Sequence, residues 1–260
     1  AKPGFAGLRR GSLPTYVNMM NSRFISIDPA AQQARHIEVP HMSSLLFTPY
    51  TLGRIELQNR IVMAPMTRSR SIGNIPDEIV ATYDQFLNTA SNRRVDHWGA
   101  SIEGRARFAV EVARRAAAAI GSDRVGIRLS PYGAFNGMAP DPQHDELYAA
   151  LAEQLSALGL VYLHLVDHRS LNSPPVKDEI KRSLRDRFHG ALILSGGYDR
   201  IRAERDLAQK RGDLVAFGRP FIANPRLPSR LREGTPLREP EPSTFYTPGE
   251  KGYTDYPIED

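Results

Sequence analysis

Two pairs of residues follow short apolar segments and have the types needed to bind a phosphate. Gly196-Gly197 come directly after residues 191–194, and Gly218-Arg219 come directly after residues 214–217. Glycine lets backbone N–H groups approach an anion closely, and an arginine guanidinium adds a bidentate donor. Taken alone, a glycine that follows a strand is better explained by a tight turn between the strand and a helix. The recurrence of such a glycine in consecutive units, once with an arginine, makes phosphate binding an equally good explanation.

A single arginine interrupts a third apolar segment. Arg128 lies within residues 125–129, whose other members are Val, Gly, Ile and Leu. A buried charge without a partner costs free energy, so Arg128 needs an interaction that offsets its burial. One explanation is an ion pair with an Asp or Glu on a neighbouring strand, and the other is contact with a cofactor at the mouth of a barrel. The residues alone favour neither.

The other reactive residue types exclude several chemistries. The chain has no cysteine, so it has no disulfide, thiolate nucleophile or Cys-ligated metal. Ser130-Pro131 and Ser195-Gly196 do not fit a nucleophile elbow, which disfavours hydrolase chemistry. His164 lies inside a predicted strand, and we expect a core histidine with satisfied hydrogen bonds. No metal is predicted, because metal-ligand spacing is lacking among His97, His144, His164, His168 and His189.

Short apolar segments alternate with helical patterns from Met42 onward. Five strands are predicted, over residues 61–65, 125–129, 161–165, 191–194 and 214–217. Apolar residues recur every three or four positions from 102 to 120, which predicts a helix that ends at Gly121. A second helix is predicted over residues 147–158, and Asn224-Pro225 predicts a further helix start. Strands that alternate with helices indicate βα units and a parallel sheet.

Composition and charge narrow the classes of protein. The 260 residues are 41% hydrophobic and 24% charged, as in ordinary globular proteins. The formal net charge is +5, and residues 1–41 supply most of it, with five basic and two acidic side chains. No dense basic patch with interleaved aromatic residues occurs, so nucleic-acid binding is disfavoured. No apolar run approaches the ~18 residues needed to span a bilayer, so a membrane span is not predicted. We expect a cytoplasmic protein.

The chain divides into two regions by composition. Residues 1–41 combine scattered charges, Pro and Gly with little periodicity, and are predicted to be a tag, a linker or a disordered tail. Residues 42–260 are predicted to form a single domain. A complete (β/α)₈ barrel needs about 250 residues, so this second region is short for one.

Five separated motifs follow one another in the order of a known family. They are residues 59–68 (NRIVMAPMTR), 85–105 (beginning QFLN), 126–131 (GIRLSP), 216–225 (AFGRPFIANP), and the tail residues 245–257. In these motifs the chain resembles the old yellow enzyme family, over nearly all of residues 45–260. The resemblance implies the α/β class and a (β/α)₈ TIM-barrel fold with FMN at the C-terminal mouth. It also implies hydride transfer from NAD(P)H through FMN to an electrophilic alkene or a nitro compound.

The resemblance also implies roles for individual residues. It places Ala64, Pro65 and Thr67 along the isoalloxazine ring. It places Arg128 beside N1 and O2, where a positive charge stabilises the reduced flavin. It assigns the flavin phosphate to Gly196, Gly197, Gly218 and Arg219. Phe245 or Tyr246 is expected to flank the dimethylbenzene edge.

The chain departs from the family most strongly between Tyr83 and Asp84. Roughly three βα units are absent there, at about 30 or more residues each. Strands 2–4 of the barrel are therefore expected to be missing, which leaves an incomplete barrel. The missing stretch would hold the glutamine that contacts the flavin, the pair that binds the substrate's carbonyl oxygen, and the tyrosine that donates a proton. Ala81 occupies the tyrosine's position and Tyr83 is not assigned its role, so the catalytic residues are unknown.

A smaller departure lies in residues 99–105, where the family usually reads Gly-Gly-Ser-Ile-Glu-Asn-Arg. Ala100 replaces the second glycine, and Gly104 replaces the asparagine. We expect Ala100 to strain a turn. We expect Gly104 to weaken the start of a helix by roughly 1 kcal/mol.

Three functional hypotheses follow. The first is an FMN-dependent oxidoreductase of the ene-reductase type. The second is a catalytically inactive truncated relative that acts at most as an FMN-binding or interaction module. The third, a lyase or isomerase acting on a phosphorylated ligand, is the weakest because no Schiff-base lysine or acid–base pair is found at a strand end. An incomplete barrel exposes two sheet edges, so a homo-oligomer that covers them is also predicted.

Overall fold

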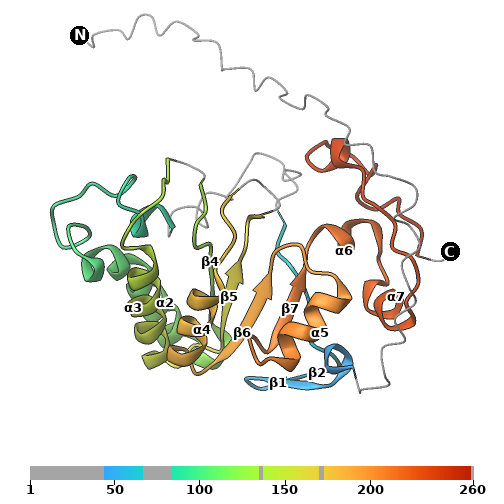
Figure 1. Ribbon diagram of the computed structural model, residues 1–260, viewed down its shortest axis with the longest axis horizontal. Helices are drawn as coiled ribbons and strands as arrows, with labels where there is room; N and C mark the ends of the chain where they lie inside the picture. The colour runs from blue at the N-terminus through green and yellow to red at the C-terminus, as the bar shows by residue number, and fades with distance from the viewer. Residues whose placement is uncertain (1–43, 67–83, 135–136, 170–172, 259–260) are drawn as a thin grey trace, which may run out of the picture. The chain divides into compact units, whose positions relative to one another are not determined.

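The computed structural model describes residues 44–66, 84–134, 137–169 and 173–258 (Figure 1). All of them belong to one compact unit, Ser43–Asp260. Residues 1–43 lie outside the described residues, so the predicted division into an extension and a single domain stays a prediction. Thr67, Ala81 and Tyr83 also lie outside them.

A five-stranded parallel sheet forms the centre of this unit. Its strands are β3 (Ile61–Met63), β4 (Gly126–Leu129), β5 (Tyr162–Val166), β6 (Ala191–Ser195) and β7 (Leu214–Phe217). Their order across the sheet is β3-β7-β6-β5-β4. The first of these strands in the chain, β3, therefore pairs with the last, β7, as the first and last strands of a closed barrel do. All five predicted strands are confirmed, and within the described ranges β3 and β4 each have a partner on one side only.

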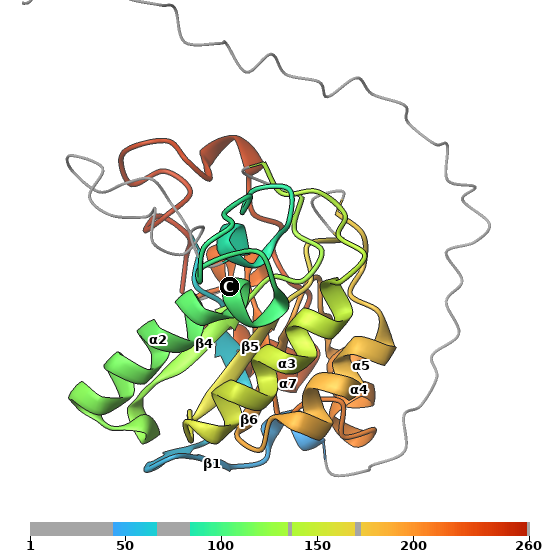
Figure 2. The same cartoon turned by 90° about the vertical axis from the view of Figure 1, so that its left-hand side faces the viewer.

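Helices cover one face of the sheet (Figures 1 and 2). They are α2 (Ile102–Ile120), α3 (His144–Ala157), α4 (Asp178–Arg187) and α5 (Arg200–Ala208). Strand side chains alternate between faces, so one set of apolar residues packs against these helices. That set forms the main core and includes Leu129, Leu163, Leu194 and Phe217.

The opposite face carries a smaller core under an antiparallel hairpin. The hairpin joins β1 (Tyr50–Leu52) to β2 (Ile55–Leu57) through a two-residue turn in which Gly53 has φ +60°. Leu52 and Leu57 pack against a cluster that contains Ile193 and Ala216. This hairpin was not predicted from the sequence. Its signal was a glycine between two short runs of alternating apolar residues.

The region after β7 differs from the sequence-based expectation. The helix start predicted at Asn224-Pro225 is wrong, because Asn224 follows the last residue of α6 (Arg219–Ala223), and α7 (Leu227–Glu233) begins two residues later than predicted. The buried Asn224 side chain donates to the carbonyl oxygens of Pro220 and Arg238 and accepts from the N–H of Arg238. Its amide is therefore used to join two loops and is not available to cap a helix.

The turn before α2 is strained as predicted, but its glycine has a different role from the one expected. Ala100 has φ +62°, a left-handed conformation that is unfavourable for a residue with a Cβ. Ser101 caps α2 by accepting a hydrogen bond from the N–H of Gly104 at 3.1 Å. A Cβ on Gly104 would lie only 2.0 Å from the carbonyl oxygen of Gly99. Gly104 is therefore required for the turn to pack against the first turn of the helix.

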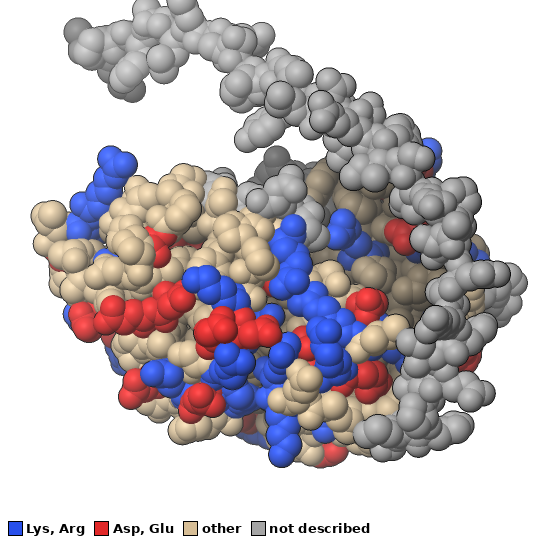
Figure 3. Space-filling model, in the orientation of Figure 1, with Lys and Arg blue, Asp and Glu red and all other residues tan. Residues whose placement is uncertain are grey.

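Charges of both signs are mixed on the visible surface. In Figure 3 the Lys and Arg side chains lie among Asp and Glu side chains over the helical face of the sheet. Pairs such as Arg182–Glu179 and Arg211–Asp178 account for part of this mixture. This face therefore lacks the single-signed patch expected of a nucleic-acid interface.

Candidate functional site

The residues singled out as phosphate ligands lie together at one edge of the sheet. Strands β6 and β7 are neighbours and run parallel, so the loops that follow them emerge side by side. Gly196-Gly197 follow β6 directly, and Gly218-Arg219 follow β7 directly. This edge is the upper one in Figure 1. The fold therefore brings together two pairs that are about twenty residues apart in the chain.

The Gly196-Gly197 loop needs both of its glycines. Gly196 has φ +124°, and a Cβ there would lie 2.4 Å from the carbonyl oxygen of Asp167. Gly197 has φ +64°, but a Cβ there would meet no atom within 4 Å. Arg202 donates a hydrogen bond of 2.7 Å to the carbonyl oxygen of Gly196 and holds the loop from the helix side. The first glycine therefore allows close packing, and the second faces open space.

The Gly218-Arg219 loop lies against the segment that follows β3. A Cβ on Gly218 would lie 3.6 Å from the sulfur of Met66 and 3.8 Å from the Cβ of Ala64. Arg219 begins α6 and is exposed. Its guanidinium has no hydrogen bond or ion pair with any residue that the structure describes. A flexible, unpaired guanidinium beside two glycine loops is suited to bind an anion.

Arg128 lies in β4, which is two strands away from β6 and three from β7 in the sheet. It is half-buried, and its Nε atom is buried without a hydrogen-bond partner among the described residues. Burial lowers the pKa of Arg128, and the nearby carboxylate of Asp84 partly offsets this. No ion pair of Arg128 forms within the described ranges. The ion-pair explanation for this residue is therefore not supported there, and contact with a ligand remains.

His164 is the register partner of Arg128 on β5. It is 3% exposed, as expected of a core histidine, but its Nε2 atom has no partner in the part of the chain that is described. The expectation of satisfied hydrogen bonds is therefore wrong for this atom. Burial, and then the charge of Arg128, lower the pKa of His164 to about 3, so the imidazole is neutral. Two adjacent strands thus each present an unpaired polar atom.

Two further groups lie near Arg128, and sequence reasoning had not assigned either of them to the site. His168 follows β5, and its Nε2 lies 3.2 Å from the hydroxyl of Ser130. The buried carboxyl of Asp84 accepts a hydrogen bond of 2.9 Å from the hydroxyl of Tyr148, and burial raises its pKa. The only sequence signal for Asp84 was its position directly before the Gln-Phe-Leu motif.

The ring-lining residues are described only in part. Ala64 is buried, and its N–H donates to the carbonyl oxygen of Phe217 at 2.9 Å, which fixes the segment after β3 against β7. Pro65 is exposed beside it, and Thr67 lies outside the described residues. Tyr246 is 66% exposed, and its ring meets the ring of Phe245 edge-on at 6.4 Å between centroids. Its exposed surface leaves it available to a ligand.

The site fits the anionic and polar parts of a flavin nucleotide. The two glycine loops and Arg219 offer backbone approach and positive charge for a phosphate. The unpartnered Arg128 Nε is a donor for which the described residues supply no acceptor. Within the described ranges no three metal-ligating side chains cluster together, and no helix is long and apolar enough to cross a membrane.

Comparisons with known proteins agree with this arrangement. A model of the NADH:flavin oxidoreductase / NADH oxidase family matches residues 80–238. Aldehyde reductase FrzD of a Cladobotryum species is 44% identical over 182 residues, which are 67% of this chain and 48% of that protein. The solved old yellow enzyme homologue from Zymomonas mobilis is 34% identical, with a TM-score of 0.62 over 67% of this chain and 50% of that one. A morphinone reductase structure is 28% identical, with a TM-score of 0.75 over 83% of this chain and 96% of that one.

The chain therefore belongs to the NADH:flavin oxidoreductase / NADH oxidase family. The resemblance to old yellow enzymes is confirmed, as are FMN and a nicotinamide reductant as the family's cofactors. The chain spans about half the length of the curated relatives it matches. The structural match to morphinone reductase nevertheless extends over nearly all of that protein. The matches that cover about half of the other relatives agree with a TIM barrel of which only part is present, as the sequence predicted.

Proposed function

We propose that this chain is an FMN-dependent oxidoreductase of the ene-reductase type. The observation that carries the proposal is the convergence of the Gly196-Gly197 and Gly218-Arg219 loops in a sheet that also contains Arg128, whose buried Nε has no hydrogen-bond partner among the described residues. The relatives support the same chemistry, since one is named as an aldehyde reductase.

The phosphate of FMN is assigned to the two glycine loops. Gly197 leaves open space at the loop surface, and Arg219 supplies a charge that no described residue neutralises. Arg202 fixes the Gly196 carbonyl from behind, so this loop need not reorganise when an anion binds. At the phosphate end of FMN, the protein thus supplies a preformed loop and a positive charge.

Arg128 is assigned to the pyrimidine end of the flavin ring, with Ala64, Pro65 and Thr67 along the ring and Tyr246 at its far edge. Bound there, FMN would supply the transfer of a hydride from NAD(P)H to the β-carbon of an activated alkene. A half-buried arginine beside the pyrimidine favours the anionic reduced ring, because its charge is only weakly screened there. The neutral His164 next to it adds no competing charge.

The substrate is proposed to be a small electrophilic alkene or nitro compound. No proton donor is assigned to this chain. A substrate proton would then come from solvent, and turnover would be slower than in a relative with a positioned tyrosine, because general acid catalysis contributes about 10²- to 10⁴-fold. A nitroalkene needs the least help from an acid and is the substrate of choice for a first assay.

The visible absorption spectrum of the purified, desalted chain tests this proposal. We expect a flavin band, either retained from the host or restored by added FMN. Anaerobic NADPH or NADH should then bleach the band, and a nitroalkene should restore it. A colourless protein that takes up no FMN would contradict the proposal. A yellow protein that no nicotinamide bleaches would identify the inactive binding module instead.

The chain is further proposed to self-associate, because the outer edges of β3 and β4 are unpaired within the described ranges. Met63 on the edge strand β3 is 61% exposed. Sedimentation velocity is expected to show a species larger than a monomer, and a single compact monomer would contradict this. A cytoplasmic location stays a prediction.

A further inference from the structure

A cavity of about 600 Å³ lies at the opposite end of the strands from the flavin site. Its walls include Arg60, Gly190 and Asp213, which directly precede β3, β6 and β7. The strands separate it from the glycine loops by roughly 15 Å, at about 3.3 Å per residue. Its volume lies within the range of small-molecule sites. It is therefore a separate candidate site and not an extension of the flavin site.

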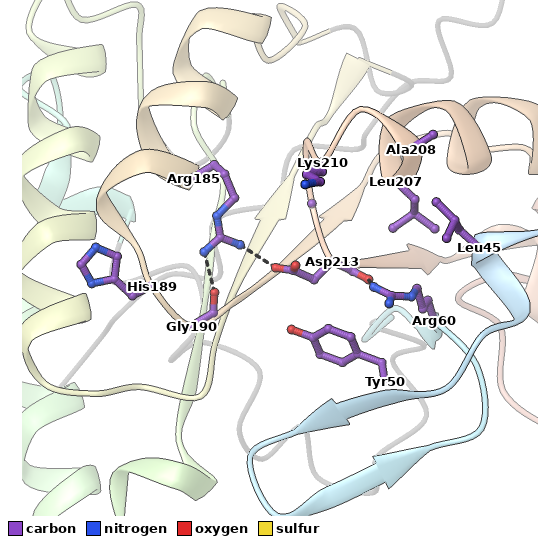
Figure 4. Close-up of a pocket in the computed structure, with 11 residues that line it drawn as sticks. Leu45, Tyr50, Arg60, Arg185, His189, Gly190, Leu207, Ala208, Lys210 and Asp213 are labelled. Carbon is purple, nitrogen blue, oxygen red and sulfur yellow. Dashed lines mark hydrogen bonds and ion pairs between the residues drawn. The ribbon is translucent and has the colours of Figure 1, made fainter.

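The polar wall of this cavity carries more positive than negative charge. The lining includes three cationic side chains, Arg60, Arg185 and Lys210, and one carboxylate, that of Asp213 (Figure 4). Arg185 contacts the Asp213 carboxylate at 2.5 Å and donates to the Gly190 carbonyl at 2.8 Å. One cation is therefore neutralised, and two remain in excess.

The two remaining cations come from different elements. Arg60 donates to the hydroxyl of Thr48 and to the backbone carbonyl of Asp213, both neutral acceptors at 3.0 Å. Lys210 follows α5 and is exposed, and its ammonium has no hydrogen bond or ion pair within the described part of the chain. A lysine just after a helix is commonly explained by its favourable interaction with the negative, C-terminal end of the helix dipole. That explanation does not extend to Arg60, which precedes a strand.

The rest of the cavity is apolar. Leu45, Leu207 and Ala208 line one side, and the Tyr50 ring lies across the opening from them (Figure 4). A second cavity of about 330 Å³ shares Tyr50, His189 and Gly190 with the first and continues beneath the hairpin. A ligand that fits both walls needs an anionic head and an apolar body.

We propose that this cavity binds a small organic anion, with a carboxylate or phosphate head between Arg60 and Lys210 and an apolar body against Leu207 and Tyr50. The surplus of two positive charges favours a phosphate monoester over a carboxylate. Nothing in the reduction of an alkene requires such a site, so the ligand would be a second molecule and not the substrate.

Isothermal titration calorimetry of the full chain with phenyl phosphate, benzoate and neutral benzyl alcohol tests the proposal. We expect both anions to bind, phenyl phosphate more tightly, and benzyl alcohol to bind much more weakly. Lys210→Gln and Arg60→Gln should each weaken phenyl phosphate binding by roughly fivefold, the effect of one partly screened charge. Asp213→Asn should tighten it, because the competing carboxylate is lost. A residue with a purely structural role would not have this opposite effect.

Arg219→Ala is the matched control, since it removes one positive charge at the other end of the strands. It should leave phenyl phosphate binding at the cavity unchanged. An equal loss in Arg219→Ala and Lys210→Gln would place the anion at the flavin site and overturn the proposal. So would the absence of heat with both anions, or equal binding of benzyl alcohol. Thermal melting of each variant confirms that the comparison is made between folded proteins.

Discussion

Arg128 and Arg219 carry the same charge in different surroundings. Arg219 is exposed at the glycine loops proposed to bind the phosphate, whereas Arg128 is half-buried and is proposed to face the flavin ring, over which charge is delocalised. We predict that Arg219→Ala weakens FMN binding more than Arg128→Ala does, by roughly tenfold for Arg219, because a guanidinium–phosphate contact is charge-assisted and bidentate. Quenching of flavin fluorescence gives both dissociation constants. Equal constants for the two variants would defeat the prediction.

The stability of Arg128→Met supplies an independent check on the same residue. An arginine whose buried Nε has no partner costs free energy in the unliganded protein, so an apolar side chain of similar length should raise stability by about 1 kcal/mol. The same variant should still lose flavin affinity. A variant that is both less stable and weaker in binding would show that Arg128 is structural.

The turn at Ala100 predicts two substitutions with opposite effects. Ala100→Gly should stabilise the protein by about 1 kcal/mol, because it relieves a left-handed conformation. Gly104→Ala should destabilise it, although alanine has the higher helix propensity, because its Cβ would collide with the Gly99 carbonyl. Urea denaturation measures both. If Gly104→Ala proved stabilising, the close packing of the turn on α2 would be wrong.

Sequence reasoning at this scale found residues whose type is unusual for their position. Arg128 in an apolar strand and Gly218-Arg219 after another were visible in this way, and the fold brings them to one edge. The roles of Asp84 and of the unpartnered Nε2 atom of His164 could not be predicted from the sequence. Their importance depends on which side chains surround them, such as Tyr148 and Arg128, and those neighbours are distant in the chain.

At the scale of elements, substitutions at the two glycines of the loop after β6 distinguish a role in packing from a role in FMN binding. Gly196→Ala should lower the melting temperature strongly, because its Cβ would lie 2.4 Å from the Asp167 carbonyl oxygen. Gly197→Ala should cost only about 1 kcal/mol, the strain of a left-handed residue, since no atom lies within reach of its Cβ. It should nevertheless weaken FMN binding, because the methyl group enters the open space. Calorimetric melting and flavin titration distinguish the two effects, and unchanged flavin affinity in Gly197→Ala would remove the loop from the site.

Elements were predictable where one strong pattern governs them. The apolar strands stand out because parallel strands buried on both faces have few polar residues, and β7 (Leu214–Phe217) has none. The helix α2 was predicted to its last residue from apolar spacing and Gly121. The hairpin was missed because three-residue strands carry little pattern, and the cap at Asn224 was wrong because its amide has tertiary partners.

At the scale of the whole molecule, buried histidines should make stability depend on pH. Burial lowers the pKa of His164 to about 3 and also lowers the pKa values of His144 and His168 from 6.5. The unfolded chain therefore binds more protons below pH 6.5 than the folded chain does. The stabilisation is fully present above pH 6.5 and is lost as pH falls toward 3. Each such histidine contributes a slope of up to about 1.4 kcal/mol per pH unit.

Denaturation at a series of pH values checks this dependence. His164→Gln should flatten the fall in stability between pH 6.5 and about 3 by close to one proton's share. Equal slopes in the parent protein and the variant would show that His164 does not resist protonation.

The pairing of β3 with β7 has a consequence for how such a chain arises. The strands that remain form an unbroken series, because the first and last staves of a closed wall are neighbours. The missing units would lie between the two free edges, and their removal separates no pair of strands that the described residues retain. A deletion in the middle of the chain thus removes strands from the free edges of the sheet and none from between its paired strands. Loss of such a stretch therefore leaves the pairing of every remaining strand in the sheet intact.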